Sequence, residues 1–129
     1  MGEQRIFTRN SEVEPFVVRS VEGAPVTGSA ELRHLLDGPD GLLIEVTYEA
    51  GMSAPPHSHD HESYCYCVRG RIRSTVDGVA YELGPGDAVF HPKGVVHQTD
   101  VLEDSVWLEF KTPPVRTAGE RGASRDPGG

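Results

Sequence analysis

Three histidines stand at alternate positions in the stretch PPHSHDHESYCYC, which covers residues 55–67. On a β-strand, side chains two residues apart point to the same face, so His57 and His59 would lie close enough to share one metal ion. His61 has the same parity and extends the series. Imidazole suits Zn(II), Cu, Fe(II) and Ni(II), so this spacing indicates a transition-metal site.

The chain that must position these histidines has 129 residues, a length that fits one domain with a single core. Its formal net charge of -8 argues against nucleic acid or an anionic membrane surface as a partner. Its apolar runs are far shorter than the ~20 residues of a membrane span, and the N-terminus lacks the apolar stretch of a signal peptide. We therefore expect a cytoplasmic protein that acts on a small molecule.

The two cysteines, Cys65 and Cys67, lie two residues apart. Neighbours at this spacing on a strand share a face but do not readily close a disulfide. We interpret them as small buried residues in a reducing compartment. A Cys-x-Cys metal pair is the alternative, although the same strand offers no further ligand of that kind to complete it.

Short alternating runs separated by Gly and Pro predict an all-β fold, a sandwich or a barrel. Residues 41–51 alternate as a strand does, and residues 105–111 predict a last strand. The stretch 64–83 predicts two strands around a bend at Gly70, then an Asp77-Gly78 hairpin turn and a further strand. Residues 31–37 would suit a helical turn.

The ends of the chain differ from its middle. Residues 1–11 have few apolar anchors, and residues 112–129 are almost entirely polar, Gly or Pro. A segment of that composition buries too little apolar surface to offset its ordering entropy. We expect one domain over residues 1–111, with an N-terminal arm, and a polar tail over residues 112–129.

Two spaced motifs resemble those of the cupin superfamily. The pattern G(x)5HxH followed by a closing glycine is met by Gly51, His57, His59 and Gly70, and the pattern G(x)5PxG(x)2H is met by Gly86, Pro92, Gly94 and His97. The resemblance implies a double-stranded β-helix, the jelly-roll cupin barrel. It also implies that His57, His59 and His97 meet on one metal ion inside it.

Two positions depart from the family pattern. The motif carboxylate falls at position 63, where this chain has Ser63, and the last Asn falls at Val101. His61 is the favoured substitute as a fourth ligand, because it shares the parity of the lost carboxylate. Glu62 is one residue out of register and would face the other way on a regular strand. His91, just before a proline, is the remaining alternative.

A site built from imidazoles alone favours Zn(II), with Fe(II) or Ni(II) next, and leaves the ionic charge uncompensated, which strengthens a Lewis acid. Small inward side chains would leave room for a ligand beside the metal. The candidate cavity residues are Ser63, Cys65, Cys67, Gln98 and Trp107. His34 is interpreted as an ordinary surface or core histidine.

The combination of chain size and a histidine-rich first motif without its glutamate resembles the cupin-type cyclases of bacterial aromatic polyketide pathways, above all the resistomycin-pathway type. That resemblance implies a metal-dependent aldol cyclisation of a poly-β-ketone. An Fe(II) or Ni(II) dioxygenase cleaving a diketone or flavonol is the alternative enzyme, and a non-enzymatic binding cupin is the third possibility. Cupins of this size usually pair, so a homodimer bridged in part by the N-terminal segment is expected.

Overall fold

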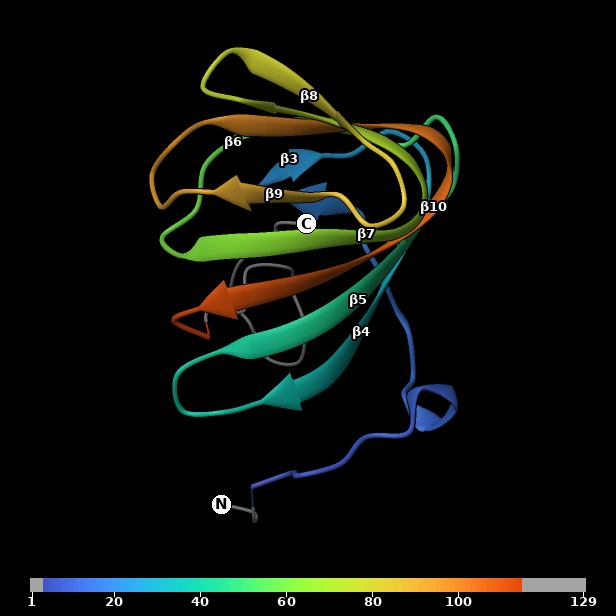
Figure 1. The fold of residues 1–129 in the computed structure, drawn as a ribbon, viewed down its shortest axis with the longest axis vertical. Coiled ribbons are helices and arrows are strands. Elements are labelled where there is room, and N and C mark those ends of the chain that lie inside the picture. Colours follow the sequence, from blue (N-terminus) through green and yellow to red (C-terminus); the bar gives the residue numbers. More distant parts are fainter. Residues whose placement is uncertain (1–3, 115–129) are drawn as a thin grey trace.

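The computed structural model describes residues 4–114, and almost all of its regular structure is β-strand (Figure 1). The expectations for residues 1–3 and 115–129, which include most of the polar tail, lie outside the described residues. The elements in chain order are η1 (Asn10–Glu12), β1 (Phe16–Val17), β2 (Ser20–Val21), β3 (Ala24–Pro25), β4 (Ala30–Asp37), β5 (Leu42–Tyr48), β6 (Ser53–His57), β7 (Glu62–Val76), β8 (Val79–Leu83), β9 (Ala88–His91) and β10 (His97–Thr112).

The barrel is organised by two long strands, β7 and β10, which pair with each other from end to end. The main sheet has the order β1-β4-β5-β10-β7-β8, with β6 paired to the first part of β10 and β9 to the first part of β7. In Figure 1 the two long strands bend at the right and pass from the layer that carries β6 and β8 to the layer that carries β4 and β5. The structure is therefore the predicted all-β jelly roll.

Gly70 sits at the bend of β7. Its φ of +95° lies in the left-handed region, and a Cβ there would come within 2.1 Å of the Ser105 Oγ and 2.4 Å of the Asp104 carbonyl oxygen. The Ser105 hydroxyl oxygen accepts a 3.0 Å hydrogen bond from the Arg71 backbone N–H. A glycine is thus required where the two long strands turn together.

The alternation of β5 places its apolar residues in the core, as its sequence predicts. Leu42, Ile44, Val46 and Tyr48 are buried, and the residues between them are half-exposed. Trp107 of β10 packs its ring edge to face on Tyr48, with centroids 5.5 Å apart. These residues belong to the apolar core of the barrel.

The Asp77-Gly78 turn is confirmed as a hairpin between β7 and β8. Both residues have positive φ, +51° and +82°, which is the geometry that such a turn needs.

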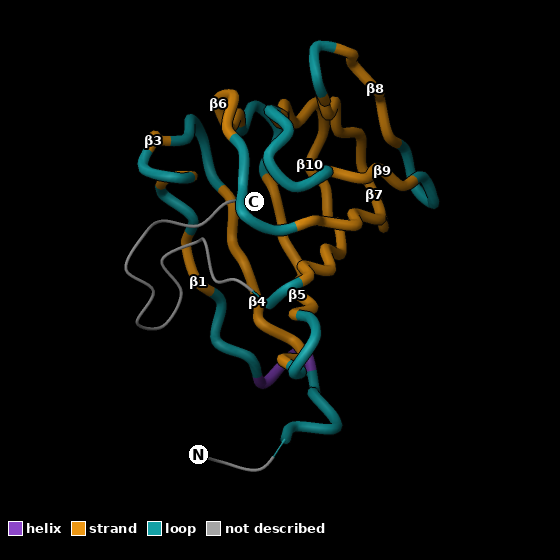
Figure 2. The backbone as a smooth tube through the Cα atoms, turned by 90° about the vertical axis from the view of Figure 1, so that its left-hand side faces the viewer, coloured by secondary structure: helices purple, strands orange, loops and turns teal. Residues whose placement is uncertain are grey.

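The helical turn expected at 31–37 is wrong. These residues form β4, which pairs with β5 along its length and has a register shift between His34 and Leu36. Pairing with a neighbouring strand outweighs the weak local helix preference of the leucines. Figure 2 shows the only helical turn of residues 4–114, the three-residue η1, outside the sheets, and no helix there has the length and apolarity to cross a bilayer.

Candidate metal centre

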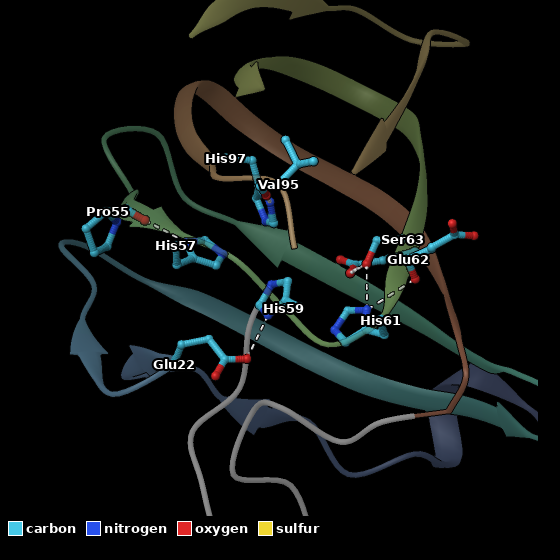
Figure 3. A network of polar contacts seen from close by, with 10 residues as sticks. Glu22, Pro55, His57, His59, His61, Glu62, Ser63, Val95 and His97 are labelled. Atoms are coloured by element: carbon cyan, nitrogen blue, oxygen red, sulfur yellow. Dashed lines mark hydrogen bonds and ion pairs between the residues drawn. The ribbon is translucent and has the colours of Figure 1, made fainter. Parts of the chain in front are cut away.

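Two elements bring the central histidines together. His57 ends β6 and His97 begins β10, and the two residues are direct partners in the antiparallel pairing of these strands. His59 and His61 follow in the short connection from β6 to β7. All four side chains are buried. Figure 3 shows them gathered in one place, although β6 and β10 lie about forty residues apart in the sequence.

The nitrogens of three of these rings form a compact set. Ligand atoms of His57, His59 and His97 all lie within 4.8 Å of one another. Their Nε2 atoms are buried and have no hydrogen-bond partner among residues 4–114. A buried polar atom without a partner is costly, so three of them on neighbouring rings indicate a site for a bound group. The chemistry of the set fits a divalent transition metal.

His61 is not a member of that set of three. Its ring stacks on the ring of His59, with centroids 4.5 Å apart and an angle of 12° between the planes. His61 therefore lies beside the three-histidine set, and its role as a fourth ligand is a proposal.

The outer nitrogen of every ring, Nδ1, faces an oxygen atom. The acceptors are the Pro55 carbonyl for His57 (2.6 Å), the Glu22 carboxylate for His59 (2.8 Å), the Glu62 carbonyl for His61 (3.1 Å) and the Val95 carbonyl for His97 (3.4 Å). A carbonyl or carboxylate oxygen only accepts, so the proton of each neutral ring is on Nδ1. The lone pair is then on Nε2, the atom that would bind a metal.

The electrostatics of the site keep the rings of His57, His59 and His97 neutral. Burial lowers the pKa of His57, His59 and His97 below the ordinary histidine value, and neighbouring histidines lower the pKa of His59 and His97 further. The Lys111 ammonium lowers the pKa of His57 and His59 in the same direction. Since only a neutral imidazole binds a metal ion, the site is ready to bind one at and below neutral pH.

Glu22 is a functional candidate that the sequence did not reveal. It lies in the turn between β2 and β3, and its carboxylate accepts the Nδ1–H of His59 at 2.8 Å. A carboxylate behind a ligating histidine fixes the ring orientation and raises the basicity of the other nitrogen. Nothing in the local sequence of this hairpin announces a contact with a histidine so far along the chain.

Glu109 and Lys111 are two further buried charged residues that were missed. Both lie on β10 with no exposed side-chain surface, and they share the inward parity of Trp107. That parity was the available signal, because Trp107 had been expected to face inward. The Ser63 hydroxyl donates a 2.7 Å hydrogen bond to the Glu109 carboxylate, so position 63 is linked to a carboxylate on another strand.

The two alternatives to His61 are placed differently by the structure. The Nε2 of His91 is 2.8 Å from the Ser74 hydroxyl, and the His91 ring stacks on His97 with centroids 4.0 Å apart. Burial lowers the pKa of His91 to about 4. Glu62 is half-exposed and accepts a hydrogen bond from the Tyr64 hydroxyl.

The expected cavity residues are found in unlike surroundings. Cys65 and Cys67 are both buried free thiols, and the Cys65 sulfur is 4.0 Å from the His91 Nδ1. Trp107 is fully buried, with its ring edge to face against His91 at 6.0 Å. Gln98 is half-buried, and its amide donates to the Asp100 carboxylate at 3.1 Å.

Known proteins of several activities are similar to this chain. The curated relatives include the dimethylsulfoniopropionate lyase DddQ of Ruegeria pomeroyi, which is 34% identical over 63% of this chain and 44% of its own length. The quercetin 2,3-dioxygenase of Bacillus subtilis is 30% identical over 64% of this chain and 26% of its own. The chain thus spans less than half the length of either relative.

Solved structures resemble nearly all of the described fold. KdgF from Halomonas sp. has a TM-score of 0.73 at 26% identity and covers 86% of this chain and 96% of its own. The polyketide cyclase RemF from Streptomyces resistomycificus has a TM-score of 0.69 at 25% identity, over 94% of this chain and 89% of its own. Residues 44–109 match the family described as Cupin domain, so the chain is a member of the cupin family.

Proposed function

We propose that the chain is a metal-dependent cyclase of poly-β-ketones of the aromatic polyketide type. The observation that carries the metal part is the buried set of His57, His59 and His97, whose ligand atoms lie within 4.8 Å of one another. Their Nε2 atoms have no hydrogen-bond partner among residues 4–114, and each Nδ1 faces an acceptor. His61 is the proposed fourth ligand. Zn(II) is the favoured ion, with Fe(II) or Ni(II) next.

The proposed reaction is an aldol cyclisation followed by loss of water. A proton leaves a carbon between two carbonyl groups, and that carbon bonds to a distant carbonyl carbon of the same chain, which closes the ring. The oxygen of the attacked carbonyl takes up a proton and becomes a hydroxyl, and loss of this hydroxyl with a neighbouring hydrogen as one water leaves a carbon–carbon double bond. A divalent ion in this site would supply Lewis-acid polarisation of a carbonyl oxygen. No oxidant is needed, since the oxidation state of the product equals that of the substrate less one water.

The protein's own residues would enclose the metal in a buried site. The four histidines are buried. The lowered pKa values of His57, His59 and His97 keep protons from competing with a metal ion for Nε2. The buried Glu109 and Lys111 add one carboxylate and one ammonium to the barrel interior. Charged groups in such surroundings act strongly on a substrate whose charge changes during reaction.

The cyclase is favoured over other cupin activities by the extent of the likeness to RemF, which spans 94% of this chain. A dioxygenase acting on a flavonol or diketone is the second candidate, supported by the 30% identity with quercetin 2,3-dioxygenase. That match covers only 26% of the relative's length, so it supports the second candidate less strongly. A non-enzymatic small-molecule-binding cupin is the third.

The test combines metal analysis with an activity assay in the absence of oxygen. Purified protein is analysed for metal per chain by mass spectrometry, together with His57→Ala, His97→Ala and, as a histidine variant outside the cluster, His34→Ala. Each protein is then incubated anaerobically with a synthetic linear poly-β-ketone thioester, and products are followed by mass.

A product lighter than its substrate by one water, formed without oxygen by the wild type and lost in His57→Ala and His97→Ala along with the metal, is expected. Turnover of quercetin with oxygen uptake, and none of the poly-β-ketone, would replace the cyclase with the dioxygenase. Binding of either compound without any turnover, by metal-loaded protein, would favour the binding cupin. Full metal content in His57→Ala and in His97→Ala would contradict the proposed site itself.

A further inference from the structure

Position 63 is where the cupin pattern has a carboxylate, and here Ser63 is linked to a carboxylate that comes from elsewhere. Ser63 lies on β7 and Glu109 on β10, and the hydroxyl donates to the Glu109 Oε2 at 2.7 Å. The same hydroxyl oxygen lies 3.3 Å from the Nδ1 of His61. All three side chains are buried. A continuous chain of contacts therefore runs from Glu109 through Ser63 to His61.

The direction of each hydrogen bond in this chain follows from the groups themselves. The Glu62 carbonyl, 3.1 Å from the His61 Nδ1, can only accept, so the ring proton is on Nδ1. The Ser63 hydroxyl has one proton, which it gives to the Glu109 carboxylate, and its oxygen remains an acceptor for the His61 N–H. The carboxylate thus orients the hydroxyl, and the hydroxyl and the carbonyl together hold the ring with its proton on Nδ1 and its lone pair on Nε2.

We infer that Glu109 is a positioning residue that, through the hydroxyl of Ser63, fixes the tautomer and orientation of His61 as a metal ligand. The carboxylate that the family pattern places on β7 is supplied here by Glu109 on β10, which would act on the metal through Ser63 and His61. This inference deepens the proposed function and rests on it, because it takes His61 as the fourth ligand. A carboxylate behind a ligating histidine is typically worth a factor of about 10 to 100 in metal affinity.

A purely structural role for Glu109 is the main alternative to be separated. Lys111 lies on the same strand and is the register partner of Ser63, so removing the charge of Glu109 also alters the charge balance around Lys111. Variants of Ser63 leave both charges in place and change only the middle of the hydrogen-bonded chain Glu109–Ser63–His61, which is called the relay below. Ser63→Ala removes the hydroxyl, and Ser63→Thr retains it on a side chain that suits a strand.

The experiment measures Zn(II) affinity of the metal-free protein by competition with a chromophoric chelator. The variants are Glu109→Gln, Ser63→Ala, Ser63→Thr and His61→Ala, together with the double variant Glu109→Gln/His61→Ala. Glu103→Gln is the matched control, since it makes the same substitution on β10 at a side chain that is 60% exposed. The thermal unfolding of each metal-free protein reports the structural cost separately.

The expected result is a loss of about 10-fold in affinity for Glu109→Gln and for Ser63→Ala, with wild-type affinity in Ser63→Thr and Glu103→Gln. In the His61→Ala background, Glu109→Gln should change the affinity less than about 2-fold, because its route to the metal is already cut. Equal losses in both backgrounds, or a loss in thermal stability with no loss in affinity, would overturn the relay. A relay that fails while His57→Ala still loses the metal leaves the proposed function standing, whereas wild-type protein that binds no Zn(II) refutes the metal site itself.

Discussion

The free energy of unfolding of the metal-free protein should fall steeply as the pH drops below the pKa of free histidine. His91 gives the clearest measure of this effect. Its side chain is 1% exposed, stacks on His97 and is bonded to the Ser74 hydroxyl. Burial first, and then the neighbouring His57 and His61, lower its pKa from 6.5 to about 4. At pH 5 the His91 imidazole is therefore protonated in the unfolded chain and neutral in the folded chain.

The sign and size of the effect follow from this difference. Because the folded pKa is below the unfolded one, the contribution of His91 to stability is fully present above pH 6.5 and is lost as the pH falls toward 4. Each unit of pKa difference corresponds to about 1.4 kcal/mol. Between pH 7 and pH 5, His91 alone should account for a loss of about 2 kcal/mol in the free energy of unfolding.

The assay is urea denaturation of metal-free wild type and His91→Gln at pH 7, 6 and 5. Glutamine is close in size to histidine and can bond Ser74, but it does not titrate. Whatever the substitution costs at pH 7, the stability difference between the two proteins should shrink by about 2 kcal/mol at pH 5. A difference that stays constant over this range would refute the conclusion that His91 is held neutral by burial.

Three further predictions follow from the structure. Glu22→Gln should weaken Zn(II) binding about 10-fold in chelator competition by loosening His59, with the exposed Glu12→Gln unchanged as its control; equal affinities would show that Glu22 does not act through His59. Gly70→Ala should lower the free energy of unfolding by about 2 kcal/mol or more in urea denaturation, because its Cβ would meet the Asp104 carbonyl, and should cost more than Gly78→Ala, which has positive φ but no atom within 4 Å. We also propose a homodimer that covers the exposed Tyr64, Tyr66 and Phe90, so light scattering should give twice the 14.0 kDa chain mass and Tyr66→Lys should reduce it; a wild-type species of 14.0 kDa at micromolar concentration would contradict the dimer.

The parts of this protein that could be predicted from sequence are those that depend on local spacing. The alternation in β5 and the Asp77-Gly78 turn needed only neighbouring residues. The resemblance to the cupin motifs implied that His57, His59 and His97 meet, and the structure brings them together. The helical expectation for 31–37 was wrong, because β4 is stabilised by its pairing with β5, and the residues of β4 alone do not reveal that pairing.

The residues missed in the site depend on contacts between distant segments. Glu22 reaches His59 from a hairpin thirty-seven positions earlier, and Glu109 reaches Ser63 from a strand forty-six positions later. The parity of Glu109 indicated an inward side chain, but a single sequence does not show which residue of a distant segment it will contact. The carboxylate that seemed to be lost at position 63 illustrates the point, since a charge can be restored from another strand without any trace in the motif.

The sharing of β7 and β10 between the two layers makes the barrel a single cooperative unit. His97 lies on the part of β10 that pairs with β6, and Glu109 lies on the part that pairs with β5. Opening either layer would therefore strip hydrogen bonds from a strand that the other layer also needs. One continuous strand, β10, carries both His97 and Glu109. Its backbone therefore fixes how far the Glu109 carboxylate lies from the histidine set.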